Sequence, residues 1–256
     1  MKNESILEKI TQARANAPQA VPAAELKAKI AGMPPCRDFA AAFRGDGIHV
    51  IAELKKASPS KGLIRADFHP VELAKELESA GAAALSVLTE PDCFLGSLRY
   101  LEEVRGAVSI PLLRKDFISN EYQILEARAA GADAVLLIAA VLEENLFTEL
   151  RGFAESLGLT ALCEAHSRSE VEMLVRGGAA MIGVNARDLA DFSVSLDTSL
   201  NLLGDIPSGI IRIAESGIRS KEDILRFCDE GSDGFLIGET LMRAERPGEK
   251  LRELSA

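Results

Sequence analysis

Four charged side chains stand inside short apolar runs that otherwise have the composition of buried β-strands. Glu53 and Lys55 lie in the run HVIAELKK, Lys115 in IPLLRKDF and Glu164 in ALCEAH. A charge moved from water into a protein core costs several kcal/mol unless it is paired or faces a polar site. Because all four stand at the carboxyl ends of their runs, we predict that they share one polar pocket.

The apolar runs recur along the chain and predict the architecture. Eight apolar or β-branched segments occur at residues 49–55, 82–89, 110–116, 134–140, 161–166, 181–186, 210–216 and 234–239, and each except the last is followed by a stretch long enough for a helix. Strands too apolar to expose either face, alternating with helices, are typical of a parallel sheet closed into a (β/α)8 TIM barrel. A doubly wound open sheet is the alternative, but the turn at residues 56–62 has no G-x-G-x-x-G motif.

The segments between the strands carry helix signals. Residues 70–81 place apolar side chains three and four positions apart and end at Gly81, which suits a helix C-cap. Glycine precedes the next strand in the same way at Gly131 and Gly178. These patterns support alternating strand and helix units.

Length and composition suit one barrel of this kind. The chain has 256 residues, enough for a single barrel with a large apolar core. We therefore predict one domain over residues 1–256, in which residues 1–45 form an N-terminal extension packed on the barrel. Ile6, Leu7 and Ile10 have helical spacing and could pack over one mouth, whereas a loosely attached arm is the alternative.

Composition disfavours several classes of protein. A formal charge of −10 and a pI near 5.0 argue against a nucleic-acid binder. The chain begins without the apolar core of a signal peptide, and its longest apolar run, residues 134–142, is too short to span a bilayer, so we expect a cytoplasmic protein. The four cysteines are widely separated and the three histidines form no metal-binding motif, so neither a zinc site nor a catalytic metal is expected.

Alternation along the strands assigns the charged residues to one face. Ile51, Glu53 and Lys55 share a face, which we expect to point into the barrel. The same register brings in further polar residues at strand ends, namely Lys115, Glu164, Asn185 and Glu215. Their convergence at the carboxyl ends of the strands favours a catalytic site over structural ion pairs. Arg212 falls on the opposite face without explanation, and His166, just beyond Glu164, is a weaker candidate.

Small residues follow the last two strands, in Ala214-Glu-Ser-Gly-Ile218 and Phe235-Leu-Ile-Gly-Glu239. Backbone N–H groups there can hold a phosphate without a cation, and Gly217 and Gly238 allow its close approach. The alternative is that these glycines only form tight turns. Ser58, Ser60 and Lys61, after the first strand, could reach the same group.

Five motifs occur in order through nearly the whole chain. They are IAELKKASPS from residue 51, LTEP from residue 88 with Phe94 and Gly96-Ser97 behind it, LRKDF from residue 113, GVNARDL from residue 183 and AESGI from residue 214. Together they resemble the signatures of the indole-3-glycerol phosphate synthase family, and ILEKI at residues 6–10 is similar to that family's N-terminal segment. Two positions depart from the usual pattern: Ala186, where a second polar residue is common, and Glu239, where a serine is also common.

The resemblance implies the fourth step of tryptophan biosynthesis from chorismate. In that step 1-(2-carboxyphenylamino)-1-deoxyribulose 5-phosphate closes its ring and loses carbon dioxide and water to give indole-3-glycerol phosphate. No cofactor is needed, and the partner is a small sugar phosphate rather than a nucleic acid or a membrane. The sequence leaves open whether the chain is a monomer and whether it associates with other enzymes of the pathway.

That chemistry suggests roles for the residues at the strand ends. Lys115, with its pKa lowered in a partly dry pocket, is the expected acid that protonates the ribulose carbonyl. Glu164 as base and Lys55 as acid or anion stabiliser would serve the dehydration. Three further residues, Glu53, Asn185 and Glu215, would orient the ribulose hydroxyls and hold the lysines.

Other residues are expected to bind the substrate. An apolar wall of Phe94, Phe117, Leu136 or Leu189 would hold the aromatic ring, and Lys55 or Arg187 would attract the anthranilate carboxylate. The remaining substrate-binding and phosphate-binding positions are Ser58, Ser216, Gly217, Gly238 and Glu239. Two rival functions are phosphoribosylanthranilate isomerase, which would need a Cys and an Asp as its acid and base pair, and a non-catalytic phosphate-binding subunit.

Overall fold

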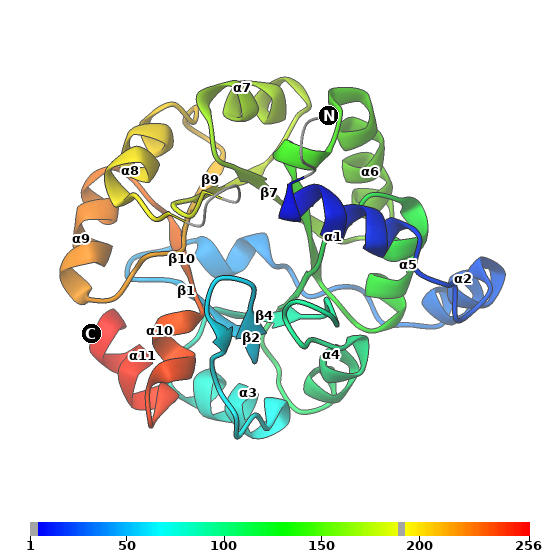
Figure 1. Cartoon of the computed structure of the whole chain (residues 1–256), viewed down its shortest axis with the longest axis horizontal. Coiled ribbons are helices and arrows are strands. Elements are labelled where there is room, and N and C mark those ends of the chain that lie inside the picture. Colours follow the sequence, from blue (N-terminus) through cyan, green and yellow to red (C-terminus); the bar gives the residue numbers. More distant parts are fainter. Residues whose placement is uncertain (1–4, 189–192) are drawn as a thin grey trace.

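The computed structural model describes residues 5–188 and 193–256, and a closed barrel of eight parallel strands forms its centre (Figure 1). The strands are β1 (Val50–Leu54), β4 (Ala84–Leu88), β5 (Leu112–Lys115), β6 (Ala134–Ile138), β7 (Thr160–Ala165), β8 (Met181–Asn185), β9 (Ile211–Glu215) and β10 (Gly234–Ile237). They pair in chain order, and β1 pairs with β10 to close the barrel. The predicted TIM barrel is confirmed and the open sheet is excluded.

Helices follow the strands and surround the barrel (Figure 1). They are α3 (Pro70–Ser79), α4 (Leu98–Arg105), α5 (Glu121–Ala129), the 3-10 helix η2 (Ala139–Val141), α6 (Glu144–Ser156), α7 (Arg168–Arg176), α8 (Leu196–Gly204), α9 (Lys221–Asp229), α10 (Glu239–Arg243) and α11 (Pro247–Ser255). The expectation that the last strand lacks a following helix is wrong, because α10 and α11 follow β10. Within the described part of the chain, no helix is long and apolar enough to cross a membrane.

Local sequence signals set where these helices begin and end. Ser97, Asn120 and Ser167 cap α4, α5 and α7, each accepting a backbone N–H of the first turn. The helix predicted over residues 70–81 is α3, and Gly81 follows it with a φ of +96°, a conformation in which a side chain is strained.

The predicted alternation of side chains along the strands is confirmed. Outward residues such as Val50 and Ala52 pack in one buried cluster with the apolar faces of the surrounding helices. Inward residues such as Ile51, Leu113 and Leu162 form a second cluster inside the barrel. The barrel interior is therefore a packed core that lies below the polar ends of the strands.

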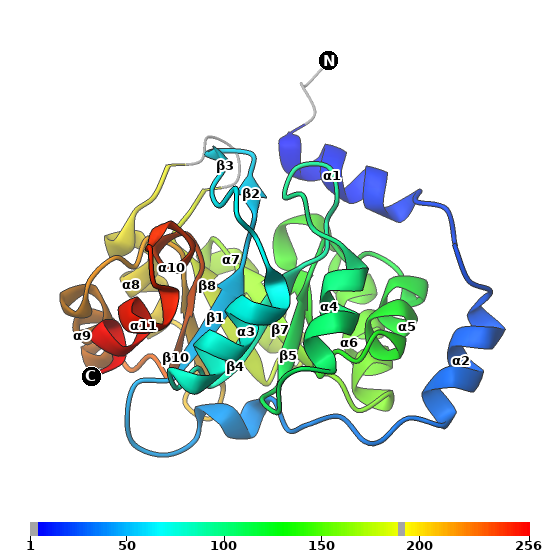
Figure 2. The ribbon, with the colours of Figure 1, turned by 90° about the horizontal axis from the view of Figure 1, so that it is seen from below.

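The chain before β1 runs from one end of the barrel to the other (Figure 2). It contains α1 (Ile6–Ala15), α2 (Ala23–Ala31) and the 3-10 helix η1 (Ala40–Phe43). At one end α1 lies near the hairpin of β2 (Ala57–Ser58) and β3 (Gly62–Leu63), and its Leu7 and Ile10 join the inner apolar cluster. At the other end Phe39 and Phe43 are buried against that cluster. Between them α2 packs against α5 on the flank, so the segment reaches the mouth along the side of the barrel.

Arg212, which the sequence left unexplained, has partners outside the barrel. Its guanidinium donates to the carbonyl of Ile206 at 2.5 Å, and its backbone N–H donates to the Asp233 carboxylate at 2.8 Å. Both partners lie in the loops that lead into β9 and β10. Arg212 therefore fixes the amino-terminal ends of two neighbouring strands and lies away from the site.

Candidate active site

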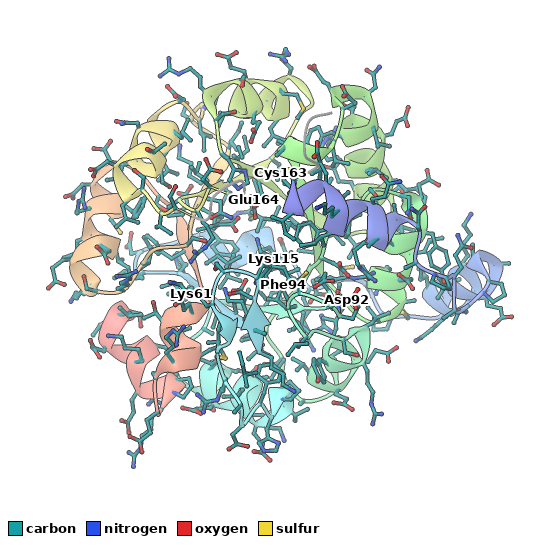
Figure 3. The ribbon with its side chains drawn as sticks, in the orientation of Figure 1. Lys61, Asp92, Phe94, Lys115, Cys163 and Glu164 are labelled. Atoms are coloured by element: carbon teal, nitrogen blue, oxygen red, sulfur yellow. The ribbon has the colours of Figure 1, made fainter. Side chains whose placement is uncertain are left out.

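A cavity of about 440 Å³ lies at the carboxyl ends of the strands. Most of the site residues predicted from the sequence are on its lining, whereas Lys61 is not; those on it are Glu53, Lys55, Ser58, Phe94, Lys115, Phe117, Glu164, Asn185, Arg187, Glu215, Ser216, Gly217, Gly238 and Glu239. Viewed along the barrel, Lys115, Glu164 and Phe94 gather near its centre (Figure 3). Leu136 of the expected apolar wall is also on the lining, whereas Leu189 lies outside the described residues.

Four charged side chains from alternate strands meet above the apolar core of the barrel. Lys115 of β5 lies between two carboxylates, since its Nζ donates to Glu164 Oε2 at 2.7 Å and to Glu215 Oε2 at 2.8 Å. Glu53 of β1 is the fourth member. Alternate strands of a TIM barrel contribute each layer of inward side chains, so this layer carries one ammonium group and three carboxylates. The three carboxylate side chains are at most 4% exposed.

The single ammonium group governs the protonation of this layer. Burial alone would lower the pKa of Lys115, but the charges of Glu164, Glu215 and Glu53 outweigh burial and raise the pKa above its ordinary value. The expected lowering of this pKa is therefore wrong, because the charges of the three converging carboxylates outweigh the effect of burial.

The two glutamates bound to Lys115 differ in pKa. Burial opposes ionisation of Glu164, but Lys115 and His166 outweigh burial and lower its pKa to about 2. Burial and the negative charge of Glu164 raise the pKa of Glu215 to about 7, against the opposing effect of Lys115. Glu164 is therefore the stronger acid of the two and Glu215 the weaker.

Two glycines, one in β8 and one directly after β10, leave space for these carboxylates. A Cβ atom added to Gly183 in β8 would collide with Oε1 of Glu215, and one added to Gly238 after β10 would collide with Oε1 of Glu53. The same Glu53 oxygen accepts a hydrogen bond from Lys55 Nζ at 2.5 Å. Gly238, singled out in the sequence for phosphate approach, therefore also makes room for the ion pair of Glu53 and Lys55.

Asn185 connects the buried layer to the rim of the cavity. Its Nδ2 donates to Glu164 Oε1 at 3.2 Å, and its Oδ1 accepts the backbone N–H of Arg187 at 3.0 Å. The Arg187 guanidinium in turn lies 3.5 Å from Ser60 Oγ and 3.4 Å from Glu239 Oε2. Asn185 thus holds in place both the buried carboxylate of Glu164 and the backbone at Arg187, whose guanidinium lines the cavity.

Phe94 and Phe117 form an apolar wall beside Lys115. Their ring centroids are 6.0 Å apart and their planes are inclined by 41°. The loop that carries Phe94 is held by Glu90, a 1% exposed residue whose carboxylate accepts the backbone N–H groups of residues 92–94. A fixed wall of this kind suits a flat aromatic group.

The turn after β9 and the start of α10 form a more polar part of the lining. Ser216 and Gly217 have φ values of +67° and +77°, and a non-glycine residue at such an angle is strained, which is typical of functional sites. Arg219 and Arg243 also line the cavity, and Arg243 Nε donates to Glu239 Oε1 at 2.9 Å. Backbone groups at this end were expected from the sequence, but these two arginines were not.

Three buried polar residues that organise the site were missed in the sequence: Thr89, Glu90 and Asp116. Asp116 Oδ2 accepts the Thr89 hydroxyl at 2.6 Å and Arg114 Nη2 at 3.0 Å. A signal for both acidic residues was present, because each stands within two residues of the end of a buried strand, in the LTEP or LRKDF motif. An acidic side chain in such a place needs buried partners.

The chain matches the indole-3-glycerol phosphate synthase family over residues 3–254. An indole-3-glycerol phosphate synthase of Alkaliphilus metalliredigens is 45% identical over 254 residues, which cover 97% of each chain. One of Koribacter versatilis is 55% identical over 208 residues, which cover 81% of this chain and 80% of the relative. One of Mycobacterium avium is 46% identical over 251 residues, covering 98% and 92%.

Solved structures of other proteins share the fold. A 3-hexulose-6-phosphate synthase of Salmonella typhimurium superposes with a TM-score of 0.65 at 13% identity, covering 81% of this chain and 96% of that one. A thiamine phosphate pyrophosphorylase of Pyrococcus furiosus has a TM-score of 0.58 at 17% identity, covering 81% and 93%. At these identities the likeness concerns the barrel alone.

Proposed function

The chain belongs to the indole-3-glycerol phosphate synthase family, and from this premise we propose how its side chains divide the reaction among them. The enzyme is a carboxy-lyase of tryptophan biosynthesis that acts on a small phosphorylated substrate. It converts 1-(2-carboxyphenylamino)-1-deoxyribulose 5-phosphate into indole-3-glycerol phosphate by ring closure, decarboxylation and dehydration. The isomerase and the non-catalytic subunit considered from the sequence are set aside by the family match.

Lys115 is the acid in ring closure. The aromatic carbon that bears the carboxylate attacks the ribulose carbonyl, whose oxygen becomes an alkoxide and takes a proton from the Lys115 ammonium. Because the neighbouring carboxylates raise the pKa of Lys115 against the effect of burial, the group stays charged until a strong base such as an alkoxide forms. Hydrogen bonds of 2.7 and 2.8 Å hold Nζ in place for this transfer.

Decarboxylation takes place against the apolar wall of Phe94 and Phe117. Ring closure leaves the carboxylate on a tetrahedral carbon beside a cationic ring system. Cleavage of the carbon–carbon bond releases carbon dioxide, and its electron pair restores the aromatic ring. The apolar wall favours this step because it solvates the carboxylate poorly. Lys55 or Arg187 guides the carboxylate into position beforehand.

Glu164 is the base in dehydration and Lys55 is the acid. The hydroxyl formed from the carbonyl leaves as water with a proton from Lys55, while Glu164 removes a proton from the ring nitrogen. A proton shift from the adjacent carbon to that nitrogen then completes the indole. Three residues that contact the lysines or Glu164 orient the ribulose hydroxyls: Glu53, Asn185 and Glu215.

The phosphate binds at the turn after β9 and at the start of α10. Backbone N–H groups of Gly217, Gly238 and Glu239 point to this role, because glycine allows close approach and a helix N-terminus favours an anion. The charges of the arginines on the same lining support the assignment. Ser58 and Ser216 supply hydroxyl groups to the same substrate.

The position of Lys115 between Glu164 and Glu215, beside an aromatic wall, is the observation that carries this assignment. Turnover of the carboxyphenylamino-deoxyribulose phosphate by purified protein, followed by indole fluorescence, tests it. The chain has no tryptophan, so its own emission does not obscure the product. A folded protein that forms no indole-glycerol phosphate would overturn the assignment.

Residues 1–256 form one catalytic unit in this proposal, with residues 1–45 as an extension of the same domain. A single chain supplies all the proposed residues, so a monomer is sufficient for activity. The cytoplasm, where phosphorylated metabolites are held, is the proposed location. A specific activity that does not change with protein concentration, together with a monomeric mass from light scattering, would support an active monomer.

A further inference from the structure

His166 lies between two carboxylates immediately behind the proposed base. Its Nε2 is 3.3 Å from Glu164 Oε1, and its Nδ1 is 3.5 Å from Glu170 Oε2. Glu170, in the first turn of α7, also accepts the backbone N–H of His166 at 2.7 Å. The imidazole is 14% exposed, so Glu170 fixes both the backbone and the ring of a largely buried histidine.

The surroundings of this histidine favour its charged form. Burial lowers the pKa of His166, but Glu170, Glu164 and Glu215 outweigh burial and raise it. These three carboxylates, from α7, β7 and β9, have the largest electrostatic effects on the ring, and Lys115 of β5 binds the other oxygen of the Glu164 carboxylate. Nε2 is buried and makes no hydrogen bond of good geometry among the described residues. A neutral ring has one N–H group for two carboxylates, so one of its nitrogens would face an acceptor, whereas an imidazolium presents an N–H group to both Glu164 and Glu170.

The proposed reaction creates a need for this second positive charge. Lys115 is the only cation hydrogen-bonded to Glu164 among the described residues, and it becomes neutral when it protonates the substrate. Glu164 would then be a buried carboxylate close to Glu215, and such a group takes up a proton. A protonated Glu164 cannot act as the base in the later dehydration.

We propose that His166, held by Glu170, is a positioning residue that keeps Glu164 ionised after Lys115 has given its proton to the substrate. The inference rests on the proposed role of Glu164 as base. It assigns a purpose to a histidine that does not line the substrate cavity. Glu170 acts one step further out, by holding the imidazolium in place.

The pH dependence of kcat separates this role from simple packing. Removing the positive charge in His166→Gln lets Glu164 bind a proton more readily, so the acid side of the kcat profile should move up by about one pH unit. At a pH on that slope kcat should fall about tenfold, while kcat at high pH and KM should stay within about threefold of the parent. Glu170→Gln should shift the profile in the same direction by a smaller amount.

Glu172→Gln is the matched control, because it removes a carboxylate from an exposed position of the same helix. Its profile should coincide with that of the parent. A uniform loss of kcat in His166→Gln at every pH, or no loss, would overturn the proposal. If His166→Gln fails to fold, the absence of a shift in Glu170→Gln overturns it.

Glu164→Gln separates this proposal from the one on which it rests. If that variant retains the kcat of the parent enzyme, Glu164 is not the base and both proposals fail. If Glu164→Gln is inactive while His166→Gln keeps the parent profile, the base assignment stands and only the role of His166 is refuted. An inactive Glu164→Gln together with a shifted His166→Gln profile supports both.

Discussion

Arg14 and Asp116 form a two-point ion pair that connects the N-terminal helix to the active site. Nε and Nη2 of Arg14 donate to Oδ1 and Oδ2 of Asp116 at 2.9 and 2.8 Å. Asp116 is 1% exposed and directly follows Lys115 in the chain. The proposed acid and the helix over the mouth are therefore joined through one buried carboxylate.

Arg14→Gln should weaken substrate binding more than it disturbs the fold. Arg114 and Thr89 remain to satisfy Asp116, so thermal unfolding should shift little. KM should rise by about 3- to 10-fold, the equivalent of about 1 kcal/mol, because α1 no longer excludes water from the cavity.

Arg99→Gln is the control for Arg14→Gln, since Arg99 forms an exposed ion pair within α4. Equal KM values in the two variants would show that α1 only packs on the barrel. Deleting residues 1–35 is a less specific test, because it would also uncover Leu125 and Ala129 beneath α2.

Lys115→Ala should abolish ring closure while KM stays within a few-fold, since other residues supply the phosphate and aromatic contacts. Loss of a positioned general acid typically costs ~10²- to 10⁴-fold in kcat. The variant also leaves Glu164 and Glu215 without their ammonium partner, so circular dichroism must show that it is folded. More than half of the parent kcat in a folded variant would assign the acid to another residue.

Gly183→Ala should lower kcat through Glu215. The new Cβ would collide with Oε1 of that carboxylate, so the carboxylate must move. Its other oxygen accepts a hydrogen bond from Lys115, so the movement also displaces the Lys115 ammonium group. A displacement of about 1 Å at a catalytic group can cost about 10²-fold in rate. Gly152→Ala is the control, because Gly152 lies in α6 with open space at its Cβ position. Equal kcat values would mean that the position of Glu215 does not limit the rate.

Glu239→Ser should lower KM. The carboxylate of Glu239 accepts from Arg243 at 2.9 Å and lies 3.4 Å from the Arg187 guanidinium, so it competes with a phosphate for both cations. Partly exposed ion pairs are worth about 0.2–1 kcal/mol, which corresponds to a decrease in KM of about 1.4- to 5-fold. The decrease should shrink at high salt, and Glu245→Ser, an exposed position beyond α10, serves as the control. A higher KM in Glu239→Ser would mean that this residue binds the substrate itself.

The sequence predicted the barrel and the convergence of charges because both depend on short-range patterns. Strand alternation placed Glu53 and Lys55 on the inner face, and the helix signals between the apolar runs indicated that strands and helices alternate. The sequence placed Glu164 and Glu215 in the same pocket as Lys115 but did not give the distances of 2.7 and 2.8 Å at which their charges outweigh burial, so the direction of the Lys115 pKa shift was mispredicted. The spacing role of Gly183 was also missed, since a glycine in a strand does not reveal which side chain from the neighbouring strand occupies the space beside it.

Closure of the barrel by β1 and β10 has a consequence for synthesis of the protein. β1 pairs with β4 on one side, but its other edge must wait for β10, which begins at Gly234. At about 5–20 residues per second, the ribosome needs roughly 10–40 s to make the intervening chain. During that time β1 presents unpaired N–H and C=O groups to other nascent chains, as any exposed edge strand does. Substitutions that weaken β10 should therefore appear first as insoluble protein in the cell, before any loss of activity in the molecules that complete the barrel.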